Sequence, residues 1–131
     1  MTSTDDLIAR AASVVRPHRV GDRLFADVGS ALVTPDGNIY LGVCIDTGSG
    51  TGFCAEHSAI AAMVTAGEYR IERIVAVWKD ERGDVMVLPP CGRCREFIRQ
   101  VDPLNLDADV ILARDNVVKL RDLLPYHAWP S

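Results

Sequence analysis

Long apolar runs and a secretory leader are both missing from this sequence. No apolar stretch approaches the roughly 20 residues that a membrane-spanning helix needs. Residues 1–6 lack the basic start and apolar core of a signal peptide. We therefore expect a cytoplasmic protein with no membrane partner.

Positive charge is also scarce. The chain has 14 Lys and Arg against 18 Asp and Glu, which gives a formal net charge of -4, and it has no basic run. Proteins that bind the phosphate backbone of nucleic acids carry a basic face. The sequence therefore argues against a nucleic-acid partner and leaves small-molecule ligands open.

Length and composition are typical of a single globular domain. The chain has 131 residues, of which 48% are hydrophobic and 24% charged. A chain of this size can bury a core without disulfide bonds. In a reducing compartment its four cysteines are better explained as metal ligands or free thiols. We predict one domain spanning residues 1–131.

Alternating helix and strand patterns predict an α/β fold. Apolar residues recur at helical spacing after Thr4, and Pro17 ends that helix. Two β-rich runs at residues 24–33 and 39–45 form a hairpin, in which Gly29 and Gly42 mark a bulge or a close backbone approach. The other expected elements are helices at 53–66 and 92–101, strands at 71–78, 85–88, 109–113 and 117–120, and a helical turn at 121–124. We predict a three-layer sandwich, with a mixed sheet of about five strands and helices on both faces.

Three cysteines and one glutamate form the candidate site. Cys91 and Cys94 have the spacing with which two sulfurs grip one zinc ion, and Cys54 supplies a third ligand from another helix start. Helix N-termini favour thiolates. Three protein ligands leave the fourth zinc position open for a water. Glu56 can then reach that water as a proton acceptor without binding the metal. We predict a catalytic zinc site.

Two other interpretations compete with catalytic zinc. A redox pair made of Cys91 and Cys94 leaves Cys54 and Glu56 without a role. A closed structural zinc needs Cys44 as the fourth ligand, but Cys44 and Cys54 are too far apart to form one close-spaced pair. We expect Cys44 to be a free thiol or a pocket wall. The glycine-rich residues 46–52 lack the lysine of a phosphate-binding loop, so we expect a mobile loop entering the site.

The site motif resembles that of the cytidine deaminase superfamily. The Cys-Ala-Glu at residues 54–56 and the Pro-Cys-Gly-Arg-Cys at residues 90–94 match its pattern of a ligand, x and Glu followed by Pro-Cys-x-x-Cys. Residues 28–37 and 123–125 are similar to the first hairpin and closing segment of the small enzymes. The resemblance implies a cytidine deaminase-like fold, Zn2+ as cofactor and a homotetramer.

The resemblance also implies the reaction, which is hydrolytic deamination of a cytosine-type nucleoside at ring C4, with Glu56 moving the protons. Cytidine or deoxycytidine then yields uridine or deoxyuridine and ammonia, as in pyrimidine salvage. Blasticidin-S deaminases share the motif, and Leu124-Pro125 with Trp129 leans toward that branch. A zinc-stabilised binding protein without turnover is the alternative from outside the enzymes.

The substrate-binding pattern departs from the cytidine enzymes. Their Asn-Val-Glu-Asn run, which holds the ribose, is replaced here by Cys44-Ile45-Asp46-Thr47. Their stacking aromatic falls at Ala26, and Phe25 is one position off, which points it to the opposite face unless a bulge intervenes. Asp46 keeps a carboxylate for the sugar. Trp129 is a candidate to close a pocket, either its own or that of a neighbouring subunit.

Five further positions lie in or next to the motif. His57 stands where the cytidine enzymes have an arginine that steadies the thiolates. We predict that His57, Arg93 and Arg95 offset the negative charge of three thiolates from outside the ligand set. Backbone groups near Ala55 and Pro90 are expected to orient the base.

Overall fold

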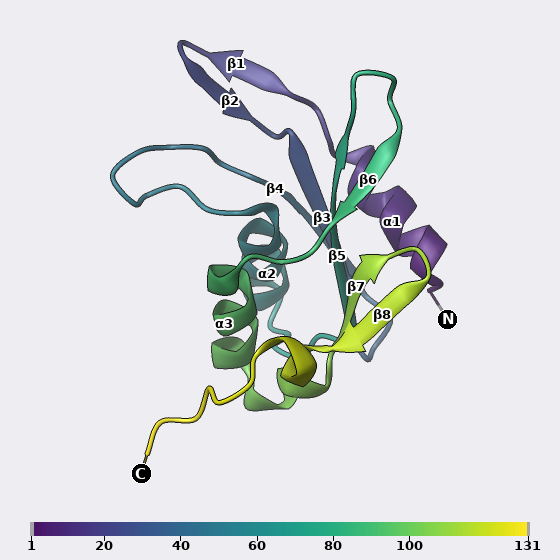
Figure 1. Cartoon of the computed structure of the whole chain (residues 1–131), viewed down its shortest axis with the longest axis vertical. Helices are drawn as coiled ribbons and strands as arrows, with labels where there is room; N and C mark the ends of the chain where they lie inside the picture. The colour runs from purple at the N-terminus through teal and green to yellow at the C-terminus, as the bar shows by residue number, and fades with distance from the viewer. Residues whose placement is uncertain (1, 131) are drawn as a thin grey trace.

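A computed structural model describes residues 2–130 of the chain. Its elements follow the order α1 (Thr4–Ser13), β1 (His18–Val20), β2 (Arg23–Phe25), β3 (Val28–Val33), β4 (Ile39–Val43), α2 (Ala55–Thr65), β5 (Arg73–Lys79), β6 (Val85–Leu88), α3 (Gly92–Val101), η1 (Pro103–Asp107), β7 (Asp109–Ala113), β8 (Asn116–Lys119) and η2 (Leu120–Leu123). Figure 1 shows their arrangement. Within this range no helix combines the length and apolar character needed to cross a bilayer.

The main sheet has six strands in a mixed topology. The order of neighbouring strands is β4-β3-β5-β7-β8, and β6 pairs with the C-terminal part of β5, from Ala76 to Lys79. Only the β5–β7 pair is parallel. β6 is the short strand predicted at residues 85–88, so the sheet matches the expected mixed sheet of about five strands.

Helices cover both faces of this sheet, which confirms the three-layer sandwich (Figure 1). On one face, α1 packs its buried side chains against β3, β5 and β7 in a core that includes Leu7, Ile8, Val75 and Ile111. On the other face, α2 and α3 form a second core. Each fully buried Leu or Ile contributes about 1.5–3 kcal/mol, so these two cores fix the layers.

Local signals explain where α1 lies. Ser3 accepts a hydrogen bond from the backbone N–H of Asp6, whose side chain accepts one from Ser3 N–H in return. Gly29 faces this helix, because a Cβ there would lie 2.3 Å from the carbonyl oxygen of Ala11. The close approach expected at Gly29 is therefore present.

Gly42 plays the same part for α2. A Cβ on Gly42 would lie 2.3 Å from the backbone nitrogen of Ala59. Any other residue at this position would push α2 off the sheet, so Gly42 sets the depth at which the N-terminus of α2 meets the sheet.

The predicted strand at residues 24–33 is interrupted. Ala26 has a φ of 61°, and β2 on its N-terminal side leaves the sheet to pair with β1 as a separate hairpin. Ala26 N–H donates to the carbonyl of Cys44, whose own N–H donates to the carbonyl of Val28. Ala26 and Asp27, the two residues before Val28, thus lie opposite the single residue Cys44, which is a bulge. β1 was not predicted, because its three exposed residues carry no apolar alternation.

Candidate active site

Two helix N-termini bring the three cysteines of the motif together. Cys54 is the N-cap of α2, Cys91 is the N-cap of α3, and Cys94 lies in the first turn of α3. Neither N-cap side chain makes a capping hydrogen bond. The three sulfur atoms lie within 4.8 Å of one another.

The spacing of the sulfurs fits a zinc ion. Cys91 Sγ lies 3.6 Å from Cys54 Sγ and 3.5 Å from Cys94 Sγ. Four ligands at about 2.3 Å around a tetrahedral zinc ion are separated by about 3.8 Å. The structure therefore sets Cys54, Cys91 and Cys94 at the corners that a zinc ion requires, and the fourth cysteine, Cys44, is not in the cluster.

Burial and mutual repulsion govern the pKa values of these thiols in the absence of metal. Burial raises the pKa of Cys94 strongly, and the neighbouring Glu56 raises it further. Burial also raises the pKa of Cys54. Burial opposes ionisation of Cys91 too, but hydrogen bonds from the backbone N–H groups of Cys94 and Arg93 and from the other thiols leave its pKa lowered. Such a cluster needs a cation to hold all three sulfurs as thiolates.

Glu56 lies buried beside this cluster, in the first turn of α2. Its exposed fraction is 5%, and burial raises the pKa of its carboxyl group. With Cys54, Ala55 and Cys91 it lines a cavity of about 200 Å³. The rest of the lining consists of the strand residues Val28, Ala76 and Leu88, together with Cys44 and Pro89. A buried carboxyl group of raised pKa, next to a metal cluster and open to a cavity, is suited to proton transfer.

The three predicted outer residues all make contacts around the cluster. His57 Nδ1 lies 3.6 Å from Cys94 Sγ, and its ring stacks on Phe97 at 4.2 Å. Burial lowers the pKa of His57, and the nearby positive charge of Arg93 lowers it further. The neutral ring can donate its Nδ1–H to the sulfur.

The two arginines fix the loops on either side of the cysteines. Arg93 donates to the carbonyl of Gly52 at 3.0 Å, which joins the start of α3 to the loop that precedes Cys54. Arg95 donates through Nε to the carbonyl of Pro90 at 2.8 Å and through Nη1 to that of Leu123 at 3.2 Å. Arg95 therefore holds the segment that positions Cys91.

The predicted substrate residues separate into two groups. Cys44 and Ala55 line the cavity. Phe25, Asp46 and Trp129 are not part of its lining. Phe25 pairs with His18 in the β1–β2 hairpin, Asp46 is exposed after β4, and Trp129 is 86% exposed in the C-terminal segment. Their roles toward a substrate stay predictions.

Sequence reasoning missed Asp27. The thiol of Cys44 donates to Asp27 Oδ1 at 2.9 Å, which brings a carboxylate beside the cavity wall. Regular strand alternation would set Asp27 and Val28 on opposite faces. The bulge at Ala26 removes that alternation, and a positive φ at an alanine has no sequence signal that could have revealed it.

Comparison with known proteins agrees with this geometry. Residues 1–106 match the family model described as the cytidine and deoxycytidylate deaminase zinc-binding region. The cytidine deaminase of Halalkalibacterium halodurans is 29% identical over 106 residues, which cover 75% of this chain and 74% of that protein. The blasticidin-S deaminase of Bacillus cereus is 38% identical over 81 residues, or 58% of each protein.

The fold has solved relatives as well. The crystal structure of cytidine deaminase from Mycobacterium leprae superposes with a TM-score of 0.74 at 28% identity, covering 92% of this chain and 96% of that one. The matched region contains the three cysteines and the glutamate of the motif. The chain belongs to the zinc-binding cytidine and deoxycytidylate deaminase family, which consists of hydrolases that act on carbon–nitrogen bonds.

Proposed function

We propose that this protein catalyses zinc-dependent hydrolytic deamination of a cytosine-type nucleoside, converting cytidine or deoxycytidine to uridine or deoxyuridine and ammonia. The observation that carries this proposal is the placement of Glu56, buried beside the three cysteines and open to the same cavity. A zinc site that served only for stability would have no use for a buried acid at its open side.

The proposed chemistry assigns one role to each group. Zinc held by Cys54, Cys91 and Cys94 would lower the pKa of a water molecule, whose oxygen can attack ring C4 once the water has lost a proton. The Glu56 carboxylate takes the proton of that water and delivers it to the ring nitrogen. It then transfers the second water proton to the departing amino group, which leaves as ammonia. Backbone groups near Ala55 and Pro90, both buried residues, orient the base.

A blasticidin-S-like nucleoside is the second candidate substrate. The relative with that activity in its name is 38% identical over 81 residues. In addition, Cys44 stands at the position where the cytidine enzymes have the asparagine that holds the ribose. The Cys44 position bears on the part of the substrate beyond the cytosine ring, so both candidates are compatible with the same reaction at C4.

Ammonia release by the zinc-loaded protein tests the proposal. Cytidine, deoxycytidine and blasticidin S are supplied in parallel, and the preferred substrate is the one with the highest kcat/KM. Glu56→Gln should lower kcat by at least about 100-fold, since proton transfer contributes that much or more. Glu81→Gln, in the exposed turn before β6, is the matched control and should retain full activity.

Two results would count against the proposal. Zinc-loaded wild-type protein that binds these nucleosides but releases no ammonia would favour the binding-protein alternative. Glu56→Gln with wild-type turnover would remove the glutamate from the mechanism.

We further propose that residues 1–131 work as one domain in a cytoplasmic homotetramer that serves pyrimidine salvage, with a nucleoside and no nucleic acid as partner. The family resemblance and the net charge of -4 support this. Sedimentation equilibrium of the zinc-loaded protein should give four times the 14.3 kDa chain mass. A monomeric mass would contradict the assembly.

A further inference from the structure

The cavity beside Glu56 is too small to enclose a nucleoside completely. Its volume is about 200 Å³, whereas pockets that enclose drug-sized ligands usually measure about 300–1,000 Å³. If the cytosine ring occupies the cavity to reach Glu56, the sugar and its substituents must lie beyond the mouth. The residues that border the mouth then contact that half of the substrate.

Sheet register identifies the residues on one border of the mouth. Ser30, Ala76 and Leu88 are aligned across β3, β5 and β6, and Ala76 and Leu88 line the cavity. Two residues farther along the strands, Val28, Trp78 and Met86 form the next row.

Residues two apart on a strand point to the same face of the sheet. The row of Val28, Trp78 and Met86 therefore continues the cavity wall outward. Val28 belongs to the lining of the cavity itself, and its neighbour in the row is Trp78.

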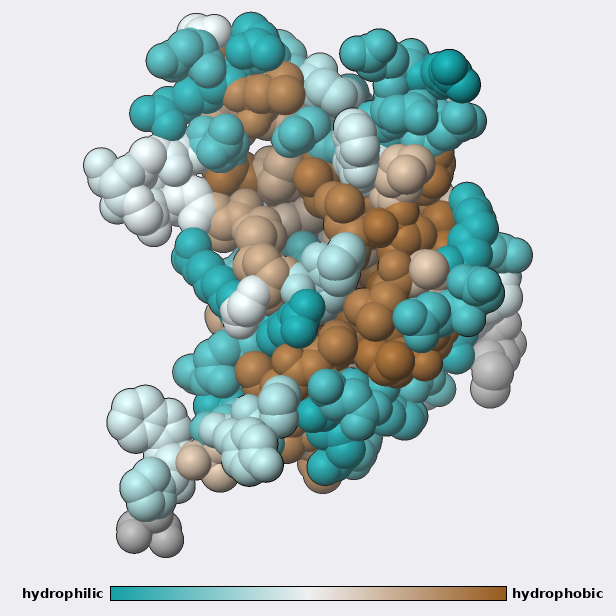
Figure 2. Space-filling view, in the orientation of Figure 1, coloured by the Kyte–Doolittle hydropathy of each residue, from teal (hydrophilic) through white to brown (hydrophobic). Residues whose placement is uncertain are grey.

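The outer part of this row is exposed and apolar. Trp78 is 40% exposed, and its cross-strand partner Met86 is 45% exposed. Figure 2 shows apolar surface between the hydrophilic tips of the β1–β2 and β5–β6 hairpins, in the region where β3 begins and β5 ends in Figure 1. Single exposed apolar side chains are common, but neighbouring ones that form a contiguous patch often mark a surface that binds a ligand or a partner.

Among residues 2–130, no aromatic residue lines the cavity. An indole ring offers a flat apolar surface on which a sugar ring or a heterocycle can pack, together with one N–H donor. Directly opposite side chains on neighbouring strands have Cβ atoms about 4.5–5.5 Å apart, so the Trp78 side chain is the direct neighbour of Val28, which lines the cavity.

We propose that Trp78, supported by Met86, is a specificity-determining residue that packs against the sugar-bearing half of the nucleoside outside the cavity. This inference rests on the proposed deaminase function, because the cytosine ring must enter the cavity for the sugar to meet Trp78. The ring contributes binding and leaves the chemical step at Glu56 unchanged.

Steady-state kinetics of Trp78→Ala test the contact. With cytidine, or whichever nucleoside proves preferred, KM should rise about three- to tenfold through loss of the aromatic surface, while kcat stays within about twofold. Trp78→Phe keeps a flat ring and should recover most of the affinity. Tyr69→Ala, which removes an exposed aromatic before β5 at the other end of the sheet, is the matched control and should leave KM unchanged.

Product inhibition separates the two halves of the ligand. The inhibition constant of uridine should rise in Trp78→Ala by the same factor as KM, whereas that of uracil, which has no sugar, should not change. An equal rise for uracil and uridine would overturn the proposal, since Trp78 would then act on the base or on the fold. An unchanged KM together with a lower assembly mass would also overturn it and make Trp78 part of a subunit interface.

Fluorescence gives a readout independent of turnover, because the chain has two tryptophans, Trp78 and Trp129. Titration of the zinc-loaded protein with uridine should change the emission of Trp129→Phe, in which Trp78 is the remaining reporter. Trp78→Phe should show no change. A response carried by Trp129 instead would overturn the inference and support the pocket-closing role predicted from the sequence. If wild-type protein deaminates no nucleoside, the proposed function is wrong. If it does deaminate one, but Trp78→Ala changes neither KM nor the uridine inhibition constant, only the inference about Trp78 is wrong.

Discussion

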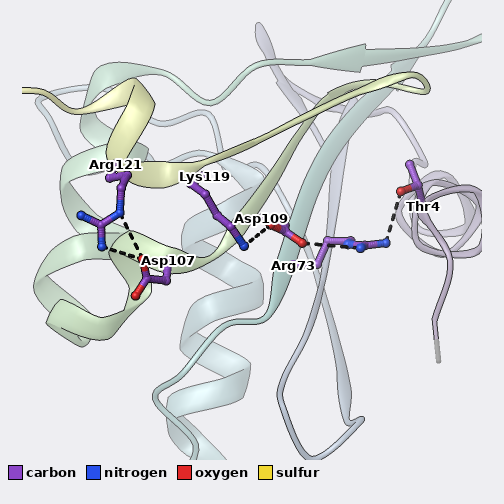
Figure 3. A network of polar contacts seen from close by, with 6 residues as sticks. All are labelled: Thr4, Arg73, Asp107, Asp109, Lys119 and Arg121. Atoms are coloured by element: carbon purple, nitrogen blue, oxygen red, sulfur yellow. Dashed lines mark hydrogen bonds and ion pairs between the residues drawn. The ribbon is translucent and has the colours of Figure 1, made fainter.

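The two ends of the central sheet are built on opposite rules. At the end where β5 begins, Arg73 donates to Thr4 and pairs with Asp109, which also pairs with Lys119 (Figure 3). At the end where β5 finishes, three thiols and Glu56 lie together around a small cavity. At the first end the charged side chains pair with one another, although within residues 2–130 the buried Nε of Arg73 has no hydrogen-bond partner. At the second end, the clustered thiols need a cation to balance their charge as thiolates, and the buried carboxyl group of Glu56 lies at a cavity that a substrate can enter.

The side chain of Asn105 is fully hydrogen-bonded at the first end. It is fully buried, accepts a hydrogen bond from the Ile71 N–H at 2.8 Å, and donates to the carbonyls of Tyr69 and Ile98 at 3.0 and 3.2 Å. These bonds tie the end of α3 to the segment before β5. The contrast indicates that this end supplies stability and the other supplies chemistry, so substitutions at the two ends should fail in different measurements.

The largest effect is expected from removing a central sulfur. Cys94→Ser should weaken zinc binding by more than about 100-fold, beyond the 10–100-fold that loss of an outer partner costs, and activity should disappear with the metal. Metal content after dialysis against a chelator measures this. Cys44→Ser removes the one cysteine outside the cluster and should keep a full equivalent of zinc. Zinc lost only from Cys44→Ser would refute the ligand set.

The next effect falls at the opposite end. Asn105→Ala removes the side-chain partner of three backbone groups, those of Ile71 and Ile98 in buried hydrogen bonds and that of Tyr69 in a part-buried one, and should lower the free energy of unfolding by about 2–4 kcal/mol. Urea denaturation of the zinc-free protein measures this, with Asn116→Ala in the exposed part of β8 as control. A loss below about 0.5 kcal/mol would mean that water replaces the amide and that this end is less tightly satisfied than the hydrogen bonds indicate.

Glu56→Gln should have the reverse pattern, with activity lost and stability kept. Burial raises the pKa of Glu56 in the folded protein, so its ionised form costs stability once the pH exceeds the ordinary pKa of about 4.3. The stability of the zinc-free variant relative to wild type should therefore hold or increase as pH rises from about 4.3 through the raised pKa. Urea denaturation across this range is the measurement. A variant that is less stable than wild type at pH 7 would make Glu56 a structural residue.

The smallest effect concerns an exposed ion pair of the first end. Arg121 donates to Asp107 and lowers its pKa (Figure 3). Its contribution to stability is present above the ordinary Asp pKa of about 3.9 and is lost as pH falls through the lowered value. In Arg121→Gln the pKa of Asp107 should return upward, which an NMR titration detects. Arg114→Gln should leave the Asp107 pKa in place, and the same shift in both variants would point to net charge instead of the pair.

Much of this architecture was predictable from local patterns. The apolar face of α1 and the Pro-Asp-Gly-Asn turn act over short sequence distances. The two glycines indicated close approaches by their residue type alone, although the helices they meet lie elsewhere in the chain. The hairpin that leaves the sheet was not predictable, because it depends on one alanine at a φ of 61°. That conformation is stabilised by hydrogen bonds to distant Arg16 and Cys44, which no local pattern encodes.

The candidate site divides in the same way. Cys54, Glu56, Cys91 and Cys94 were identified by their spacing, since a zinc site constrains residue type and separation along the chain. Asp27 and Trp78 were missed, because their places depend on a bulge and on cross-strand register. Both are properties of how strands meet, so spacing along the chain does not determine them.

By itself, then, the sequence determined the reacting end of this protein. Ligands and proton acceptor lie in two short motifs, at helix starts that local propensity specifies. Only the tertiary structure decided what surrounds them. Gly42 fixes how closely α2 approaches the sheet, Asp27 accepts a hydrogen bond from Cys44, and Trp78 is aligned with Val28. The physical reason is that zinc chemistry needs few atoms at fixed spacing, whereas a substrate surface is assembled from strands whose register is settled only when the whole sheet packs.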